Sequence, residues 1–339
     1  MTSISVIVPT YRRPLDLRKC LEALKRQTRT ADEVIVIVRN TDSETRSFLE
    51  TFDSESLPLA IADVTVPGQV AALNKGLEQS KGEIIAITDD DGVPYPSWLE
   101  RIEYHFASDR HVGGVGGRDW MYINNQLVEG KSELVGKVQL FGRTIGRHHL
   151  GIGQPREVEI LKGANMSYRR SAISNLRFDT RLLGTGAEVH NDLAFSLSIK
   201  KAGWKLIYDP QVEIDHYHGK RFDEDRRGEF NRTARFNEVF NHTLVLLDYL
   251  PPWRRAIFLI WTVLVGTRKG YGLVQWLRFL PQEGNLAGKK WLLSMQARWQ
   301  GWLAWFRSGA NNTSLDLLTS STISDRSALE INKISVEKS

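Results

Sequence analysis

Short apolar runs alternate with amphipathic stretches along the first part of the chain. Residues 4–9, 33–38 and 84–88 are rich in Ile and Val, as β-strands are, and each run is followed by polar residues. Residues 15–24 and 71–79 place apolar side chains at helical spacing. This alternation predicts an α/β fold with a doubly wound, mostly parallel sheet. No G-x-G-x-x-G sequence follows the first strand, which argues against a dinucleotide-binding fold.

Three adjacent carboxylates, Asp89, Asp90 and Asp91, end the third of these strands. Burying adjacent anions is costly, so we expect them at the exit of the strand, where a cation can neutralise them. Ligands of open α/β sheets also bind at the carboxyl ends of strands. Asp89 and Asp91 offer hard oxygen ligands to Mg²⁺ or Mn²⁺, which can in turn hold a diphosphate. The alternative is a solvated acidic turn.

The first strand leads into Thr10, Tyr11, Arg12 and Arg13. A loop that carries a hydroxyl group, an aromatic ring and arginines has side chains suited to binding a nucleotide. Tyr11 can stack on a base, and Arg12 or Arg13 can contact a phosphate.

Five segments, in this order, resemble the family 2 glycosyltransferases, which are inverting, nucleotide-sugar-dependent enzymes with the GT-A fold. They are residues 6–14, 67–76, Asp89 to Asp91 with the Trp98-Leu99 pair beyond it, 162–170, and 191–216. The resemblance covers roughly residues 3–220. It implies a GT-A sheet, and it identifies the acidic triplet as a D-x-D motif.

The resemblance also implies roles for individual residues. The nucleotide-sugar site would contain Pro9, Thr10, Tyr11, Arg13, Arg39, Gly68, Asn74, Lys75, Asp89 and Asp90. The acceptor and sugar site would contain Gly163, Asn165 and Trp204. A Mg²⁺ or Mn²⁺ ion would bind Asp89, Asp91 and His216; the alternative for His216 is a structural turn.

The chain departs from the family pattern at two positions. The family has Glu-Asp before its Ala-Gly-Trp segment, whereas this chain has Asn191-Asp192. We expect Asp192 to be the catalytic base, a role compatible with capping a helix, while Glu188 supplies the missing carboxylate or is itself the base. The second departure is Arg39, where family members often carry an acidic residue that reads uracil. The base of the nucleotide therefore stays open.

The C-terminal part has a different composition. Seven of the ten tryptophans lie between residues 253 and 307, together with nine Lys and Arg residues and a single acidic one, Glu283. Tryptophan, lysine and arginine side chains interspersed with leucines are typical of a segment that binds at a membrane interface. The longest apolar run, 256–265, is too short to span a bilayer, and a core helix is the alternative. Nucleic-acid binding fits poorly, because the tryptophans sit among Ile, Leu and Val.

The sequence thus predicts a catalytic domain over residues 1–225, a helical membrane-proximal extension over 226–310, and a disordered tail over 311–339. The predicted function is metal-dependent, inverting transfer of a sugar from a nucleotide-diphosphate sugar, with UDP as the expected nucleotide. The expected acceptor is a glycan or polyprenyl-linked molecule in polysaccharide synthesis, at the inner face of the cytoplasmic membrane. A lone cysteine, Cys20, suits a reducing compartment. The alternatives are a sugar-phosphate nucleotidyltransferase and an inactive, membrane-associated assembly protein.

Overall fold

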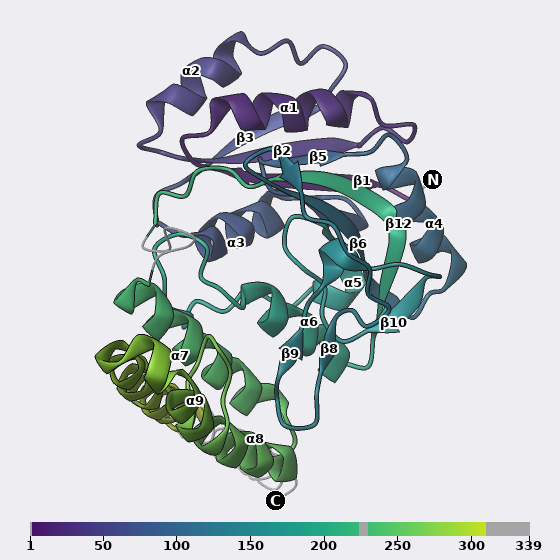
Figure 1. The fold of residues 1–339 in the computed structure, drawn as a ribbon. Coiled ribbons are helices and arrows are strands. Elements are labelled where there is room, and N and C mark those ends of the chain that lie inside the picture. The colour runs from purple at the N-terminus through teal and green to yellow at the C-terminus, as the bar shows by residue number, and fades with distance from the viewer. Residues whose placement is uncertain (1, 224–229, 310–339) are drawn as a thin grey trace, which may run out of the picture.

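The computed structural model describes residues 2–223 and 230–309. Its central feature is a ten-stranded sheet with the order β10-β12-β6-β11-β4-β1-β2-β3, in which β5 also pairs with β12 and β7 with β6 (Figure 1). The strands are β1 (Ile4–Thr10), β2 (Glu33–Arg39), β3 (Leu59–Val64), β4 (Ile84–Ile87), β5 (Gly92–Pro94), β6 (Val112–Ile123), β7 (Gln126–Leu127), β10 (Arg156–Val158), β11 (Met166–Arg169) and β12 (Lys205–Tyr217). A separate hairpin joins β8 (Lys137–Val138) to β9 (Thr144–Ile145).

The amino-terminal half of the sheet is parallel. Strands β4, β1, β2 and β3 pair side by side in the same direction. They are joined by α1 (Pro14–Lys25), α2 (Ser43–Thr51) and α3 (Gln69–Gln79). Beyond β4 the sheet is mixed, because β11 runs antiparallel to both β4 and β6, whereas β12 runs parallel to β6. The predicted α/β fold with a mostly parallel central sheet is therefore confirmed.

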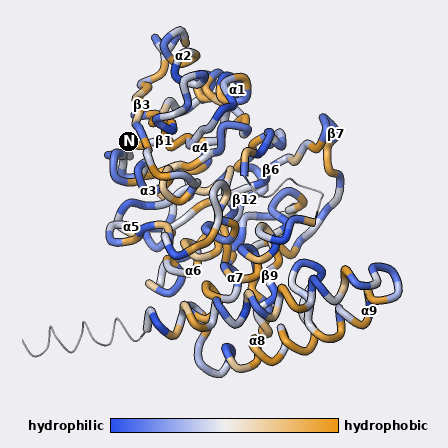
Figure 2. Tube along the Cα trace, turned by 90° about the vertical axis from the view of Figure 1, so that its left-hand side faces the viewer, coloured by the Kyte–Doolittle hydropathy of each residue, from blue (hydrophilic) through white to orange (hydrophobic). Residues whose placement is uncertain are grey.

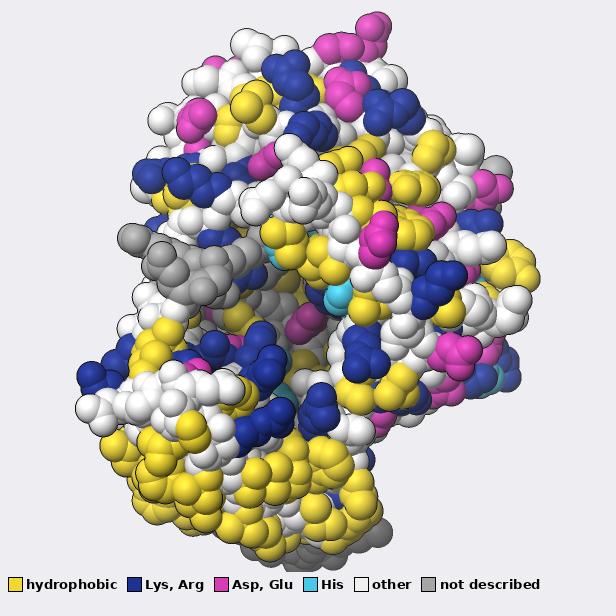
Figure 3. Space-filling model, in the orientation of Figure 1, with side chains coloured by type: hydrophobic (Ala, Val, Ile, Leu, Met, Phe, Trp, Pro, Cys, Tyr) yellow, Lys and Arg dark blue, Asp and Glu magenta, His cyan; other side chains and the backbone are white. Residues whose placement is uncertain are grey.

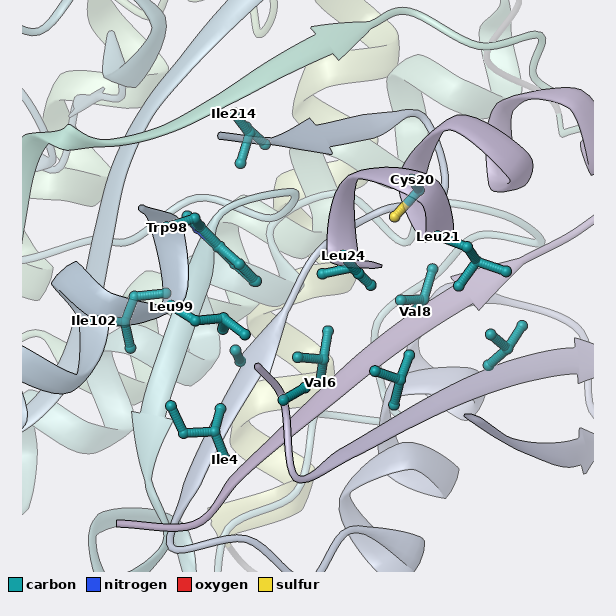
Figure 4. Packing of buried hydrophobic residues seen from close by; sticks show 14 of the residues in the cluster. Ile4, Val6, Val8, Cys20, Leu21, Leu24, Trp98, Leu99, Ile102 and Ile214 are labelled. Atoms are coloured by element: carbon teal, nitrogen blue, oxygen red, sulfur yellow. The ribbon is translucent and has the colours of Figure 1, made fainter. Parts of the chain in front are cut away.

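Strands β1, β2 and β4 are buried on both faces, whereas the edge strand β3 is partly exposed. Every residue of β1 is buried, as expected for a central strand covered by helices on two sides. Val6 and Val8 pack under α1 and α4 (Trp98–Ser108), whereas Ile7 points to the opposite face and packs with α3. Figure 4 shows the first of these cores, where Cys20 lies among Leu21, Leu24 and the strand side chains. Cys20 is thus a core residue.

The C-terminal part is helical and lies beside the sheet domain, as Figure 1 shows. After α5 (Arg170–Ile173) and α6 (Asn191–Lys201), it comprises α7 (Arg232–Tyr249), α8 (Pro252–Leu264), α9 (Leu273–Glu283) and a further helical segment over residues 285–309. Buried side chains of α7 form a third core with residues of α6 and of the β8–β9 hairpin. Within the described residues, no helix has both the length and the hydropathy to cross a membrane. The predicted tail, 311–339, lies outside the described residues.

Candidate active site

A cavity of about 370 Å³ opens where β1, β2 and β4 end, and the start of α6 and the end of β12 complete its walls. Figure 3 shows that this face of the molecule is hollowed between the sheet domain and the C-terminal helices. The cavity brings together eleven of the residues predicted from the sequence. These are Pro9, Thr10, Tyr11, Arg13, Arg39, Gly68, Asp89, Asp91, Gly163, Asp192 and His216.

The middle carboxylate of the triplet, Asp90, is buried behind the cavity wall. Thr10 Oγ1 donates to Asp90 Oδ2 at 2.7 Å, and Arg13 Nη2 lies 2.7 Å from Asp90 Oδ1. Burial raises the pKa of Asp90 to about 8, although the Arg13 charge opposes that shift. Asp90 therefore anchors two cavity residues from behind and does not line the cavity.

Asp91 directs one carboxylate oxygen to the protein and the other to His216. Its Oδ2 accepts hydrogen bonds from Arg13 Nη1 and from the backbone N–H of Gly219, both at 2.9 Å. Its Oδ1 is buried, accepts no hydrogen bond from the residues that the structure describes, and lies 3.4 Å from His216 Nε2. Burial opposes ionisation of Asp91, but His216 and Arg13 outweigh it and hold the pKa of Asp91 below its usual value.

The chemistry of this corner fits a divalent cation. Asp89, Asp91 and His216 each offer a ligand atom, and these atoms lie within 4.8 Å of one another. Carboxylate oxygens suit Mg²⁺ and Mn²⁺, and Asp91 Oδ1 accepts no hydrogen bond from the described residues, which leaves its lone pairs available to a cation. Burial and the charge of Asp91 raise the pKa of Asp89. A cation between the two carboxylates would relieve that repulsion.

His216 is fixed in orientation by residues that the sequence did not single out. Its Nδ1 lies 3.4 Å from Asp119 Oδ2, and Lys162 pairs with the same carboxylate. Burial alone would lower the pKa of His216. The carboxylates of Asp119 and Asp91 have the larger, opposite effect, so the pKa is raised to about 9. Without a cation, the ring is therefore protonated at neutral pH, so a cation must displace a proton to bind it.

An amide network connects the metal corner to the start of α6. Gln69 Nε2 donates to Asp89 Oδ1 at 3.1 Å, and Asn191 Nδ2 lies 3.3 Å from Gln69 Oε1. Asn191 Nδ2 also donates to the carbonyl oxygen of Ala187 at 2.8 Å. A Glu at position 191 would place a carboxylate oxygen against these acceptors. The neutral residue that breaks the family pattern therefore fits its surroundings in this chain.

Asp192 stands in the first turn of α6 and faces the cavity. Its Oδ1 accepts from the N–H of Leu193 at 2.8 Å, and the N–H of Gly163 lies 3.4 Å from its Oδ2. Burial raises the pKa of Asp192, although these backbone hydrogen bonds oppose the shift. A carboxylate that is held by backbone donors and has a raised pKa is well suited to accept a proton near neutral pH.

Glu188 occupies a different place from Asp192. Its Oε2 accepts from the N–H of Val70 at 3.1 Å, so its negative charge lies at the N-terminus of α3. It fills the space beside Gly68, where an added Cβ would lie only 2.0 Å from Glu188 Oε1. Gly68 also has φ of 112°, which favours glycine. Glu188 does not line the main cavity.

Besides Asp90, two residues predicted for the nucleotide-sugar site, Asn74 and Lys75, lie outside the cavity. Asn74 donates to the carbonyl oxygen of Phe178 at 2.9 Å and accepts from its N–H at 2.8 Å. Lys75 pairs with Glu78 on the same helix at 3.1 Å. In this structure, Asn74 ties α3 to a distant loop.

Two residues predicted for the acceptor site, Asn165 and Trp204, also lie outside the cavity. Asn165 Oδ1 accepts from Trp98 Nε1 at 2.9 Å, and its Nδ2 donates to the carbonyl oxygen of Val212 at 2.8 Å. Trp204 packs where Gly113 leaves room, since a Cβ there would lie 2.6 Å from the Trp204 Cβ. Both residues hold strands and helices together behind the site.

The chain is similar to known glycosyltransferases. The chain is 36% identical over 214 residues to glycosyltransferase AglE of Haloferax volcanii, covering 62% of this chain and 65% of AglE, which is less than two thirds of that relative. It is 25% identical over 224 residues to glucosyl-dolichyl phosphate glucuronosyltransferase of the same organism, covering 63% of this chain and 68% of the relative.

A solved structure and a family model complete the comparison. The crystal structure of S. aureus TarS 1-349 in complex with UDP-GlcNAc superposes with a TM-score of 0.59 and 15% identity, over 88% of this chain and 81% of that one. This likeness shows a shared GT-A fold. The model for "Glycosyl transferase family 2" matches residues 5–177, which is about half of the chain. The protein therefore belongs to glycosyl transferase family 2.

Proposed function

We propose that this protein is a metal-dependent, inverting glycosyltransferase that uses a nucleotide-diphosphate sugar. The observation that carries the proposal is that a single cavity holds a metal-ligand set, Asp89, Asp91 and His216, and a separate carboxylate, Asp192, held by backbone donors. The cation set suits a diphosphate, and Asp192 suits an acceptor hydroxyl group. Together they provide a base for the proton of the acceptor hydroxyl group and stabilisation of the negative charge on the departing diphosphate, both of which sugar transfer requires.

Asp192 acts as the base in this proposal. As the acceptor hydroxyl oxygen bonds to the anomeric carbon, its proton passes to a carboxylate oxygen of Asp192. The bond from the anomeric carbon to the diphosphate oxygen breaks, and the electron pair leaves with the nucleoside diphosphate. Attack opposite the leaving group inverts the configuration. A bound Mg²⁺ or Mn²⁺ supplies Lewis-acid stabilisation to the departing diphosphate.

Further residues at the cavity favour binding of the anionic donor and orient the catalytic carboxylate. The cavity wall also contains Lys162, Lys220 and Arg221, whose positive charges suit the anionic donor. The N–H groups of Gly163 and Leu193 fix the direction of the Asp192 carboxylate. Glu188, as the partner of the α3 N-terminus, positions the wall that carries Gly68.

The experiment that tests this function is nucleotide release from candidate donors by the full chain. We expect release that requires Mg²⁺ or Mn²⁺, stops on chelation, and falls strongly in Asp192→Asn. Product anomers analysed by NMR should show inversion. Release that is equal with and without chelator would contradict the metal requirement, and release undiminished in Asp192→Asn would contradict the assignment of the base.

The C-terminal helices support a membrane-bound acceptor. No residue of α9 is buried, although its sequence is rich in leucine. Figure 3 shows hydrophobic side chains covering the end of the molecule formed by these helices, with Lys and Arg along the edge nearer the hollow, and Figure 2 shows α8 along the same apolar margin. The exposed apolar residues are Trp253, Ile260, Val263 and Leu264 on α8, Leu273, Val274, Leu277 and Leu280 on α9, and Leu286, Leu292, Trp299 and Phe306 on 285–309.

This surface is proposed to lie on the anionic, inner face of the cytoplasmic membrane. An apolar helix face flanked by cations binds at the lipid interface without crossing it. The acceptor is accordingly proposed to be a polyprenyl-linked or other lipid-linked glycan, and a relative's name, glucosyl-dolichyl phosphate glucuronosyltransferase, agrees with such an acceptor. The division into a catalytic domain over 1–225 and a membrane-proximal extension over 226–310 is part of this proposal.

A further inference from the structure

Strands β6 and β12 carry a second face beside the active site. His216 lines the cavity, and because successive side chains of a strand point to opposite faces, Asp215 and Tyr217 point away from it. The register places Trp120 and Tyr122 of β6 beside Asp215 and Tyr217. We call this surface the tyrosine face, and its members, all partly exposed, are Tyr95, Trp120, Tyr122, Glu213, Asp215 and Tyr217.

Three tyrosines surround the carboxylate of Asp215. The rings of Tyr122 and Tyr217 stack with their centres 4.7 Å apart and 17° between their planes. The hydroxyl group of Tyr95 donates to Asp215 Oδ1 at 3.3 Å. Burial and the charge of Asp215 raise the pKa of all three tyrosines, which shows that the carboxylate is close to each of them. The hydroxyl groups of Tyr122 and Tyr217 form no hydrogen bond with the residues that the structure describes.

The two carboxylates of this face have unused acceptor capacity. Glu213 Oε1 accepts from Trp120 Nε1 at 2.9 Å, and Asp215 Oδ1 accepts from Tyr95. Within the described residues, the second oxygen of each carboxylate accepts no hydrogen bond, and neither group forms an ion pair with Lys or Arg. The face therefore presents free acceptor oxygens beside aromatic rings.

The chain's own cations already cover two of the rings. Lys19 Nζ lies 5.5 Å from the centre of the Tyr217 ring, and the guanidinium carbon of Arg118 lies 3.5 Å from that of Trp120. A ligand that binds through cation–π contacts would have to compete with them. Tyr122 is different, because only the Tyr217 ring stacks on it among the described aromatic and cationic side chains.

This combination of groups suits a neutral sugar ring. A pyranose has apolar C–H groups on its faces and hydroxyl donors along its edge, so an aromatic ring can pack against the former while Asp215 and Glu213 accept from the latter. A phosphate or a uronic acid would be repelled by the same two carboxylates. The apolar surface of a protein partner would remove both carboxylates from water without pairing them, which is costly.

We propose that the tyrosine face binds the glycan chain of the acceptor outside the cavity, with a neutral sugar ring packed on Tyr122. The glycan as occupant rests on the proposed function. Figure 3 shows hydrophobic and acidic side chains next to each other on the side of the molecule that carries the hollow, where Figure 1 draws β5, β6 and β12. An acceptor chain that extends beyond the cavity thus has a further surface to bind.

The test is binding of neutral hexasaccharides to the full chain, measured by saturation-transfer difference NMR titration with cellohexaose, maltohexaose, mannohexaose and chitohexaose. We expect at least one of them to bind, and Tyr122→Ala to weaken that binding roughly tenfold, the scale of one buried aromatic contact. Asp215→Asn keeps an acceptor for Tyr95 but loses the charge, so it should weaken binding severalfold. The acidic hexamer of galacturonic acid should bind less tightly than the neutral sugars.

Tyr104→Ala is the matched control. Tyr104 is an exposed tyrosine on α4, outside the tyrosine face, so its loss should leave hexasaccharide binding unchanged. Thermal unfolding checks that each variant is folded, and Tyr122→Leu, which keeps apolar volume without the ring, replaces Tyr122→Ala if the alanine variant is not.

Two results would overturn the inference. One is that none of the four neutral hexasaccharides binds, and the other is that the Tyr122 variant binds as tightly as Tyr104→Ala. Both would leave the proposed function standing, because the metal ligands and Asp192 lie in the cavity and not on this face. Failure of the proposed function would appear instead as nucleotide release that does not depend on Mg²⁺ or Mn²⁺.

Discussion

Replacing Glu188 and Asp192 by their amides, one at a time, separates a structural carboxylate from a catalytic one. In Glu188→Gln, the amide oxygen can still accept from Val70 N, but the negative charge at the N-terminus of α3 is lost. Such a charge contributes about 0.3–1 kcal/mol, and up to about 2 kcal/mol where it is partly buried. We therefore expect Glu188→Gln to lose about 1–2 kcal/mol of unfolding free energy and to keep most of its turnover.

Asp192→Asn should behave in the opposite way. Burial raises the pKa of Asp192, so the folded state holds the charged form less well than the unfolded state. A group of this kind lowers stability as pH rises through its pKa values, so at pH 7–8 the neutral Asn should leave stability unchanged or raise it slightly. Loss of the base should cost turnover about 100-fold or more, while donor binding is kept.

The assay pairs thermal or urea unfolding with nucleotide release for both variants and the wild type. The expected result is a less stable, active Glu188→Gln and a stable, inactive Asp192→Asn. The reasoning is refuted if Glu188→Gln abolishes transfer at unchanged stability while Asp192→Asn remains active, because Glu188 would then be the base. A Glu188→Ala variant, which removes the acceptor as well, should be less stable than Glu188→Gln.

Three further results are expected. In Asn191→Glu, the Gln69 amide group, which donates to Asp89, should turn toward the new carboxylate. Titration should then show an Mn²⁺ affinity reduced roughly tenfold or more, and unchanged affinity would contradict the network. Mn²⁺ affinity should rise from pH 6.5 to 8.5, because the cation displaces a proton from His216, whose metal-free pKa is raised to about 9; a pH-independent affinity would argue against this ligand. The full chain should sediment with anionic vesicles and far less with neutral ones. Leu277→Asp on α9 should weaken that binding, whereas Leu15→Asp on α1, where the leucine is even more exposed, should not; equal sedimentation of both variants would count against the apolar face.

The sequence predicted those parts of the site whose signal is local. The Ile-rich strand before Asp89 and Asp91 places both at a strand exit, and the loop after β1 carries Tyr11 and Arg13 into the same cavity. These positions follow from the order of strands and helices in a parallel sheet. The resemblance added His216 and Asp192, which are distant in sequence.

The remaining parts depend on contacts that no local pattern encodes. Gln69 and Asn191 are 122 residues apart in the chain, and Glu188 meets Val70 across 118 residues. Asp119, which orients His216, occurs in a glycine-rich strand without a recognisable motif. The first two pairs form only when α3 packs against the loop before α6, and the third forms only when β6 pairs with β12.

Composition was likewise insufficient for the tryptophan-rich segment. Trp253 and Trp299 are largely exposed, whereas Trp302 and Trp305 pack against the third core. The same residue type therefore serves both the packing of the helices and the exposed face. Only the helix geometry of residues 252–309 distinguishes the two sets.

The most direct test of the central claim is Mn²⁺-dependent binding of a nucleotide-diphosphate sugar to the wild type and to Asp89→Asn. The Asn oxygen can still accept from Gln69, and burial raises the pKa of Asp89, so the variant should fold with undiminished stability. Calorimetry should show donor binding that requires Mn²⁺ in the wild type and is lost or strongly weakened in Asp89→Asn. Donor binding of equal strength in both proteins, with or without Mn²⁺, would contradict the account.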